Sequence, residues 1–308
     1  MSKRFQGYIQ LSLAMVLVGS TVIASKIIAS GLPPFTATAL RFAIALPLFL
    51  GLMRATATPW PRLPKGDWLI LFLQAGAGSV GYTTLLISGL KLTPAADAGV
   101  IIGTLPVVSA AIAVIILGER PQRSVLMAAL LAAAGVLAIV FRPEAAGPHS
   151  LAGAALIFGA VICEGLFILL GKRLDSEIPP LTLSALMAGF GGAIAIPFAL
   201  AELPLAGTTG APALAAVAYY ALVPTIGGFL LWYAGLEKVS GTEASVFTAL
   251  APVSALLLAA AALGEPIAAN QMIGMGSVLL AVLSLSLRAT NLTRTGHAAQ
   301  PTTSLQER

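Results

Sequence analysis

A single acidic residue, Glu164, stands inside an apolar stretch that runs from about residue 151 to 171. If this stretch is a membrane-spanning helix, a rise of about 1.5 Å per residue places Glu164 within roughly 5 Å of the middle of the span. An ionised carboxylate is unfavourable at that depth, and such acids are functional candidates by default. Glu164 is predicted either to accept a proton or to be the counter-charge of an ammonium group on a ligand. The alternative is a protonated carboxyl that joins two helices by a hydrogen bond.

Two stripes of aromatic and polar residues recur at spacings of three or four, which places each stripe on one face of a helix. They consist of Gln74, Gly78 and Tyr82, and of Thr225, Phe229 and Trp232. We expect them to line a ligand site, in which rings contact the apolar or cationic part of a ligand and polar groups orient it. Lipid or interface anchoring is the alternative. The other candidates inside apolar stretches are Phe167, Thr21, Thr104 and Thr248, although a threonine hydroxyl can also bond to its own helix.

Two pairs of residues at matching places in the chain are candidates for conformational change. Pro106 and Pro252 fall near the middle of two apolar stretches, where the missing N–H and the ring clash kink a helix. We expect a hinge at each proline, with a static packing kink as the alternative. Lys26 and Lys172 follow two other apolar stretches and are candidate gate residues, although lysines at the ends of spans commonly extend to the lipid headgroups.

Arg41 and three acidic residues complete the set of charged candidates near apolar stretches. Arg41 lies about six residues into its predicted helix, and we expect it either to extend towards the headgroups or to pair with an acid such as Asp97. Glu119 and Glu265 each follow a Leu-Gly pair at the end of an apolar stretch. We expect both glutamates to be solvated at the interface, with direct involvement in transport as the alternative.

No cofactor, metal ion or nucleic acid is expected. His149, His297 and the single cysteine, Cys163, do not form a set with metal-ligand spacing. Residues 76–81 spell G-x-G-x-x-G, but they lie inside an apolar stretch with no strand before it, so we interpret these glycines as sites of helix packing. A single acid inside the apolar stretches also argues against an enzyme, which needs two or more polar reacting groups at one depth.

The composition indicates which elements must position these residues. The chain has 308 residues, of which 58% are hydrophobic and 9% charged, and its mean hydropathy is +0.95, whereas soluble proteins average about 25% charged residues. We therefore predict an all-α integral membrane protein with about ten transmembrane helices. The expected helices are residues 7–29, 35–53, 67–90, 95–117, 123–141, 151–171, 180–201, 212–236, 242–263 and 267–288.

The distribution of basic residues predicts the orientation of these spans. Ten spans place both termini on one side, and that side then carries 13 of the 17 lysines and arginines. Because basic residues are enriched on the cytoplasmic side, both termini, including residues 1–6, are predicted to be cytoplasmic. Residues 289–308 are polar without an apolar period and are expected to form a disordered tail.

The chain repeats one pattern at an offset of 146 residues, as between Lys26 and Lys172. At this offset Pro106 matches Pro252, and the Leu-Gly-Glu triplet at 117–119 matches the triplet at 263–265. Each copy holds five expected spans, an odd number, so the second copy must enter the membrane from the opposite face. The predicted organisation is a first repeat at 7–141 with helices 1 to 5, a connecting loop at 142–150, and an inverted second repeat at 151–288 with helices 6 to 10.

An inverted repeat lets one central site open alternately to either side of the bilayer. This architecture favours secondary transport of a small molecule. The alternatives are an intramembrane enzyme and a scaffold that translocates nothing.

Two blocks carry a resemblance to a known family. GLKLTPAADAGVIIGTLPVVSAAIAVIILGERP at 89–121 and GLEKVSGTEASVFTALAPVSALLLAAAALGEPI at 235–267 resemble the tandem EamA-type domains of the drug/metabolite transporter superfamily, over roughly residues 7–288. The resemblance implies ten helices, a central cavity lined by helices 1, 3, 4, 6, 8 and 9, and export of amino acids or related metabolites. The chain departs from the family where helix 1 reads MVLVGSTVIASK without the usual tryptophan, and where helix 6 reads CEGLF.

Together these observations predict a proton- or gradient-driven exporter of small polar or zwitterionic metabolites, working by alternating access in the bacterial inner membrane. Amino acids are the leading substrates, and an amino-acid-derived product such as an opine-type metallophore is a further candidate. A coupling proton and the lipid bilayer are the expected partners besides the substrate. Uptake of a small metabolite is the alternative direction.

Overall fold

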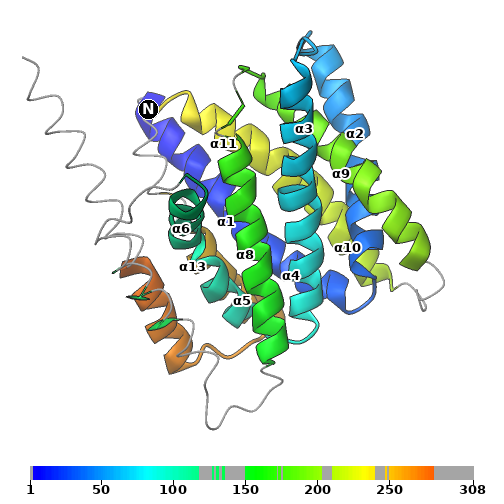
Figure 1. Ribbon diagram of the computed structural model, residues 1–308. Helices are drawn as coiled ribbons and strands as arrows, with labels where there is room; N and C mark the ends of the chain where they lie inside the picture. Colours follow the sequence, from blue (N-terminus) through cyan, green and yellow to red (C-terminus); the bar gives the residue numbers. More distant parts are fainter. Residues whose placement is uncertain are drawn as a thin grey trace, which may run out of the picture.

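The computed structural model describes residues 3–117, 127, 130–131, 134–135, 150–171, 173–174, 176–202, 210–239, 247 and 250–280. In this part of the chain the regular elements are helices (Figure 1). They are α1 (Lys3–Ala29), α2 (Pro34–Ala55), α3 (Lys65–Gln74), η1 (Ala75–Gly81), α4 (Tyr82–Leu90), α5 (Ala95–Ile102), α6 (Leu105–Leu117), α8 (Leu151–Gly171), α9 (Pro180–Glu202), α10 (Ala211–Tyr220), η3 (Ala221–Gly227), α11 (Gly228–Leu236) and α13 (Leu250–Leu263). Residues 269–280 are also helical.

Six of the described helices are long and apolar enough to cross a membrane. They are α1, α2, the continuous α3–η1–α4, α8, α9 and the continuous α10–η3–α11. The helices α5 and α6 form a seventh candidate, bent by 43° at the break between them. The prediction of an all-helical, multi-pass membrane protein is confirmed for these spans. The expected helix at 123–141 lies almost wholly outside the described residues, and those at 242–263 and 267–288 are described in part.

The bend between α5 and α6 is explained by Pro106. This residue is the second of α6 and has no N–H to donate to the carbonyl of Ile102, where α5 ends. A kink was predicted at this proline, and the structure confirms it. The equivalent kink at Pro252 stays a prediction, because residues 248–249 lie outside the described chain.

A seven-residue π-helix interrupts α-helical hydrogen bonding at the same place in both copies. The segments η1 and η3 start 146 residues apart, and the flanking helices keep the same offset. In η3, Pro224 cannot donate to Tyr220 O, and Thr225 Oγ1 donates to that oxygen at 2.8 Å instead. In η1, Ser79 O accepts hydrogen bonds from side chains, which include Arg41 Nη2 at 3.0 Å. Such segments free backbone carbonyls for other partners and occur frequently at functional sites.

The first helix of each copy packs against the other copy. Helix α1 contacts α11 and α13, whereas α8, its equivalent, contacts α4 and α6. Helix α2 contacts its own equivalent, α9, and Figure 1 shows these two helices side by side. The two copies therefore interlock and do not form separate bodies.

Glycines allow two of these crossings to be close. A Cβ on Gly235 would lie 3.3 Å from Gly7 O, and a Cβ on Gly89 would lie 2.9 Å from Gly153 O. The two glycine pairs are equivalent at the 146-residue offset. Because small residues let helix backbones approach in a membrane, the same close crossing has been kept in both copies.

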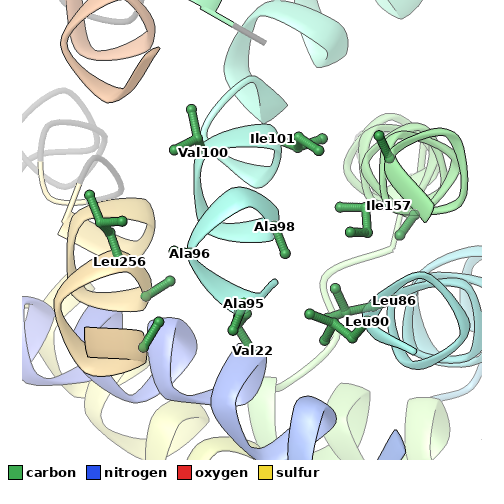
Figure 2. Close-up of a cluster of buried hydrophobic side chains, with 14 of the residues drawn as sticks. Val22, Leu86, Leu90, Ala95, Ala96, Ala98, Val100, Ile101, Ile157 and Leu256 are labelled. Carbon is green, nitrogen blue, oxygen red and sulfur yellow. The ribbon is translucent and has the colours of Figure 1, made fainter. Parts of the chain in front are cut away.

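An apolar cluster around α5 joins the copies at one end of the structure (Figure 2). Figure 2 shows α5 between α1, α4, α8 and α13. The side chains labelled there are Val22, Leu86, Leu90, Ala95, Ala96, Ala98, Val100, Ile101, Ile157 and Leu256, all buried. Since α8 and α13 belong to the second copy, burial of this cluster stabilises the contact between the copies.

Carboxylates from the second copy accept hydrogen bonds at the start of two helices of the first. Glu202, the last residue of α9, accepts hydrogen bonds from two N–H groups at the start of α2, at 2.8 and 3.3 Å. Glu265 accepts from Ala95 N at 3.0 Å and from Ala96 N at 2.9 Å. Glu265, which was expected to be solvated, is partly exposed, and its carboxylate also satisfies free N–H groups of α5. Glu119 lies outside the described residues.

Candidate functional site

A cavity of about 730 Å³ lies between the two copies. The first copy lines it with α1, α2, η1, α4, α5 and α6, and the second copy with α8, α9, α10, η3, α11 and α13. The resemblance implied walls from helices 1, 3, 4, 6, 8 and 9. The structure adds to these walls the second helix of each copy, α2 and α9, and Leu279 of the helix at 269–280.

Many positions that line the cavity are equivalent in the two copies. The pairs at the 146-residue offset are Met15 and Val161, Val18 and Glu164, Thr21 and Phe167, Arg41 and Met187, Phe42 and Ala188, Gly78 and Pro224, Ser79 and Thr225, Thr83 and Phe229, Leu105 and Ala251, and Pro106 and Pro252. The cavity is thus built on the relation between the copies. Its two charged residues, Arg41 and Glu164, each have an apolar equivalent in the other copy.

Ten of the residues predicted to form the site or its hinges line this cavity. They are Glu164, Tyr82, Trp232, Phe229, Phe167, Thr21, Gly78, Thr225, Pro106 and Pro252. Phe229, from the second predicted stripe, belongs to a group of aromatic rings. Its ring stacks on Tyr233 with centroids 5.9 Å apart and meets the ring of Phe49 edge-on at 6.5 Å. The cavity wall is therefore mainly apolar and aromatic, which suits the apolar part of a small ligand.

The η1 segment determines where the Phe167 ring lies. A Cβ on Gly78 would lie 2.6 Å from Phe167 Cγ, so a larger residue in η1 would displace this ring. Because Gly78 has no side chain, the Phe167 ring of α8 can pack against the backbone of η1. The two elements thus form one continuous part of the cavity wall.

Two predicted ligand-contacting residues do not line the cavity. Gln74 is buried, and its Nε2 donates to Phe167 O at 3.1 Å. The stripe that included it assumed α-helical spacing throughout, but η1 begins at the next residue and changes the register. Thr104 is buried, and its Oγ1 donates to Ile101 O at 2.6 Å. Thr248 lies outside the described residues.

Lys26, one of the two predicted gate residues, bonds to the backbone of the first copy. Its Nζ donates to Leu90 O at 2.7 Å and to Thr93 O at 2.9 Å. Because Leu90 ends α4, the ammonium group also lies at the favourable, negative end of that helix. Lys26 therefore joins α1 to the α4–α5 connection in this conformation. Its equivalent, Lys172, lies outside the described residues.

Arg41 is the functional candidate whose place the sequence did not reveal. It is 7% exposed, lines the cavity, and lies with its guanidinium carbon 4.3 Å from the ring centre of Phe42 and 4.6 Å from that of Tyr220. It does not extend to the headgroups. The proposed partner Asp97 instead accepts a hydrogen bond from Gln271 Nε2 at 2.6 Å. The signal that could have identified Arg41 is the one used for Glu164, a charge within an apolar helix.

Glu164 lines the same cavity from α8 and is only partly exposed. Within the described residues no hydrogen bond or ion pair holds its carboxylate. Arg41 and Glu164 influence each other electrostatically, but no ion pair joins them in the described structure. Ser109 Oγ, also in the cavity wall, is buried without a hydrogen-bond partner. The cavity therefore presents a cation, an acid and a hydroxyl that a small ligand can engage.

Comparison with known proteins places this architecture in one family. The EamA-like transporter family model matches residues 5–141 and 151–287. The uncharacterized transporter YetK of Bacillus subtilis (strain 168) is 33% identical over 282 residues, covering 90% of this chain and 86% of the relative. The aromatic amino acid exporter YddG of Ancylobacter novellus is 27% identical over 265 residues, covering 82% of this chain and 87% of the relative.

A solved structure described as "Crystal structure of protein" resembles this one with a TM-score of 0.62 and 22% identity, over 94% of this chain and 98% of that one. A likeness at this identity shows the fold alone. The family model matches the chain twice, and the two matches start 146 residues apart, as the repeated pattern does. From these matches, the chain belongs to the EamA-like transporter family and is a multi-pass membrane protein that transports a small molecule.

Proposed function

We propose that this protein is a proton-coupled secondary transporter that exports small polar or zwitterionic metabolites across the bacterial inner membrane. The observation that carries the proposal is the cavity between the copies, which is lined by equivalent positions of both copies and by Glu164. A site at the interface of two repeats is where alternating-access transporters bind their substrates.

The proposed architecture is ten helices in two inverted repeats, with both termini in the cytoplasm. Two features support it. Five expected spans per copy require the second copy to be inverted, and 13 of the 17 basic residues then fall on the cytoplasmic side. Pro106 and Pro252 are the proposed hinges, and Lys26 and Lys172 the proposed gate residues.

Alternating access is supported by a difference between two equivalent crossings. A Cβ on Gly19 of α1 would lie 2.6 Å from Ala251 O and 2.9 Å from Ala255 N, both backbone atoms of α13. On the equivalent Gly165 of α8, the nearest atom would be the end of a side chain, Ile112 Cδ1, at 2.7 Å. The backbones of α1 and α13 are therefore in close contact at Gly19, whereas the equivalent crossing of α8 with α6 at Gly165 is looser. Alternating access requires that two related halves exchange such a close and a loose crossing.

Amino acids with aromatic side chains are the first substrates to test. A relative carries the name aromatic amino acid exporter, and the cavity wall here includes Phe42, Phe49, Phe229 and Trp232. Aromatic walls of this kind hold an apolar side chain, whereas Glu164 offers a charge for an ammonium group. The other amino acids and amino-acid-derived products follow in the same assay.

The decisive experiment measures flux of phenylalanine, tyrosine and tryptophan in proteoliposomes at several pH values. We expect Glu164→Gln to fold but to lose most of the flux and its pH dependence, because the amide cannot take up and release the proton. Glu237→Gln is the matched control, since Glu237 is exposed just after α11. Equal and equally pH-dependent flux in Glu164→Gln would remove this residue from the mechanism.

Inside-out vesicles from cells distinguish export from uptake. Accumulation of substrate inside inside-out vesicles with an acidic lumen supports export. Accumulation only in right-side-out vesicles supports uptake. Chemical conversion of the substrate without flux would support an enzyme. Binding without flux or conversion would support a scaffold.

A further inference from the structure

The guanidinium of Arg41 is held in place but lacks an anion. Its Nη2 donates to Ser79 O at 3.0 Å, whereas its Nε is buried without a hydrogen-bond partner. The rings of Phe42 and Tyr220 lie within 4.6 Å of its guanidinium carbon. Contacts with the two rings and a side-chain hydrogen bond with Tyr220 position the guanidinium, and its Nε N–H is left to be satisfied by another molecule.

A buried, unpaired cation is unfavourable unless something compensates it. In the described residues no carboxylate pairs with Arg41, and Glu164 acts on it only from a distance. The equivalent position in the second copy is Met187, which lines the same cavity. The fold therefore accepts an uncharged side chain of similar length at this position, so support of the helices alone does not explain an arginine.

A structural role would use the guanidinium differently. A clamp that joins α2 to its neighbours needs only the bond from Nη2 to Ser79 O and the hydrogen bond with Tyr220, and it would be strongest if Nε also met a protein oxygen. Instead, Nε has no partner and the residue lines the cavity. The arrangement is that of a binding group, because a planar fork presents paired donors that match the two oxygens of a carboxylate.

We propose that Arg41 binds the carboxylate of the substrate, so that the cavity selects molecules with a free carboxylate over their neutral or decarboxylated analogues. This inference rests on the proposed function and names the substrate class of the same site. The substrate carboxylate meets Arg41, its apolar part contacts the aromatic wall, and its ammonium group is left to Glu164. Arg41 is in this view a specificity-determining residue.

The test compares acids with their amides by equilibrium binding. Thermal stabilisation of the detergent-purified protein is titrated with phenylalanine, leucine and serine and with the amide of each. We expect the wild type to bind at least one acid about 10-fold to 100-fold more tightly than its amide, as a hydrogen-bonded charge pair implies. In Arg41→Met this ratio falls to about one, and in Arg41→Lys, which keeps the charge without the planar fork, it is intermediate.

Arg54→Met is the matched control, because Arg54 lies at the exposed end of the same helix. It should keep the wild-type ratio. If gel filtration shows that Arg41→Met does not fold, the acid-to-amide affinity ratios of the wild type and of Arg41→Lys still decide whether Arg41 binds the carboxylate. A wild type that binds every acid and amide equally, or an Arg41→Lys or Arg41→Met protein that keeps the full ratio, overturns the inference.

The same titrations separate this inference from the proposed function. A wild type that prefers acids through Arg41 but moves none of them in liposomes leaves the binding role standing and refutes transport. A wild type that moves amides and acids at equal rates, with equal affinities, supports transport and overturns the role of Arg41.

Discussion

Replacing Gly19 or Gly165 by alanine tests whether the two copies exchange conformations. The residues occupy equivalent places on α1 and α8. In the structure the Gly19 crossing leaves no room for a Cβ, because the backbone atoms Ala251 O and Ala255 N would lie 2.6 and 2.9 Å away. We expect Gly19→Ala to destabilise this conformation, and Gly165→Ala to be tolerated in it.

The magnitudes follow from which atoms must move. Backbone overpacking of this kind costs about 1–3 kcal/mol. At Gly165 the end of the Ile112 side chain can turn away, at about 0.5–1.5 kcal/mol, and the helix gains up to about 1 kcal/mol from alanine. The net effect of Gly165→Ala on this conformation is therefore near zero. If the crossings exchange, Gly19→Ala shifts the equilibrium towards the other state by about 5-fold to 150-fold, and Gly165→Ala shifts it the opposite way.

Two assays read these effects. Unfolding in mixed SDS micelles gives the stability of each variant, with Gly51→Ala as the control, because a Cβ on Gly51 would meet no atom within 4 Å. The second assay uses Val18→Cys in a Cys163→Ser background. Labelling of the introduced cysteine from each side of the membrane reports to which side the cavity opens. Opposite shifts in the two labelling ratios are expected for the two alanine variants. Shifts in the same direction, or equal losses of stability, would refute the reasoning.

Two further substitutions test the packing around the site. Glu265→Ala removes the acceptor of two N–H groups at the start of α5 and should lower stability by about 0.5–2 kcal/mol, with Glu265→Gln less affected; equal unfolding midpoints for Glu265→Ala and the wild type would contradict this role. Gly78→Ala places a Cβ against the Phe167 ring and should weaken binding of aromatic substrates by displacing that ring into the cavity. An unchanged Kd for phenylalanine in Gly78→Ala would show that the ring does not shape the site.

Hydropathy and repetition predicted the arrangement of the chain, because both are properties of local sequence. The bounds of the observed spans from α1 to α11 agree with the expected ones within a few residues. The chemistry of a lone carboxylate inside a helix was enough to single out Glu164, which the structure places in the cavity wall. Symmetric prolines likewise predicted the bend at Pro106.

The missed features depend on hydrogen-bond register and on contacts between distant segments. A π-helix differs from an α-helix in which carbonyl each N–H reaches, and this difference leaves no mark on hydropathy. The predicted place of Gln74 on the same face as Gly78 and Tyr82 was consequently wrong. Arg41 stood near the expected end of its helix, and only the rings of Phe42 and of the distant Tyr220 show that its guanidinium is enclosed. Its interpretation as a residue that reaches the headgroups could not be corrected without the fold.

Under the proposed function, two kinds of residue in this structure have different roles in transport. Features that recur at the 146-residue offset, such as the prolines, the paired glycines and the π-helices, make the halves alike, as two conformations of similar free energy would require. The equivalents of Arg41 and Glu164 in the other copy are Met187 and Val18, so under the proposed function a zwitterionic ligand is expected to bind in one orientation. Changes to the recurring residues should therefore alter turnover more than affinity, whereas changes to the two charges should alter affinity and proton coupling. A repeated scaffold that carries one charge in each copy, at positions that do not correspond, would in this proposal turn the duplication of one sequence into a directional binding site.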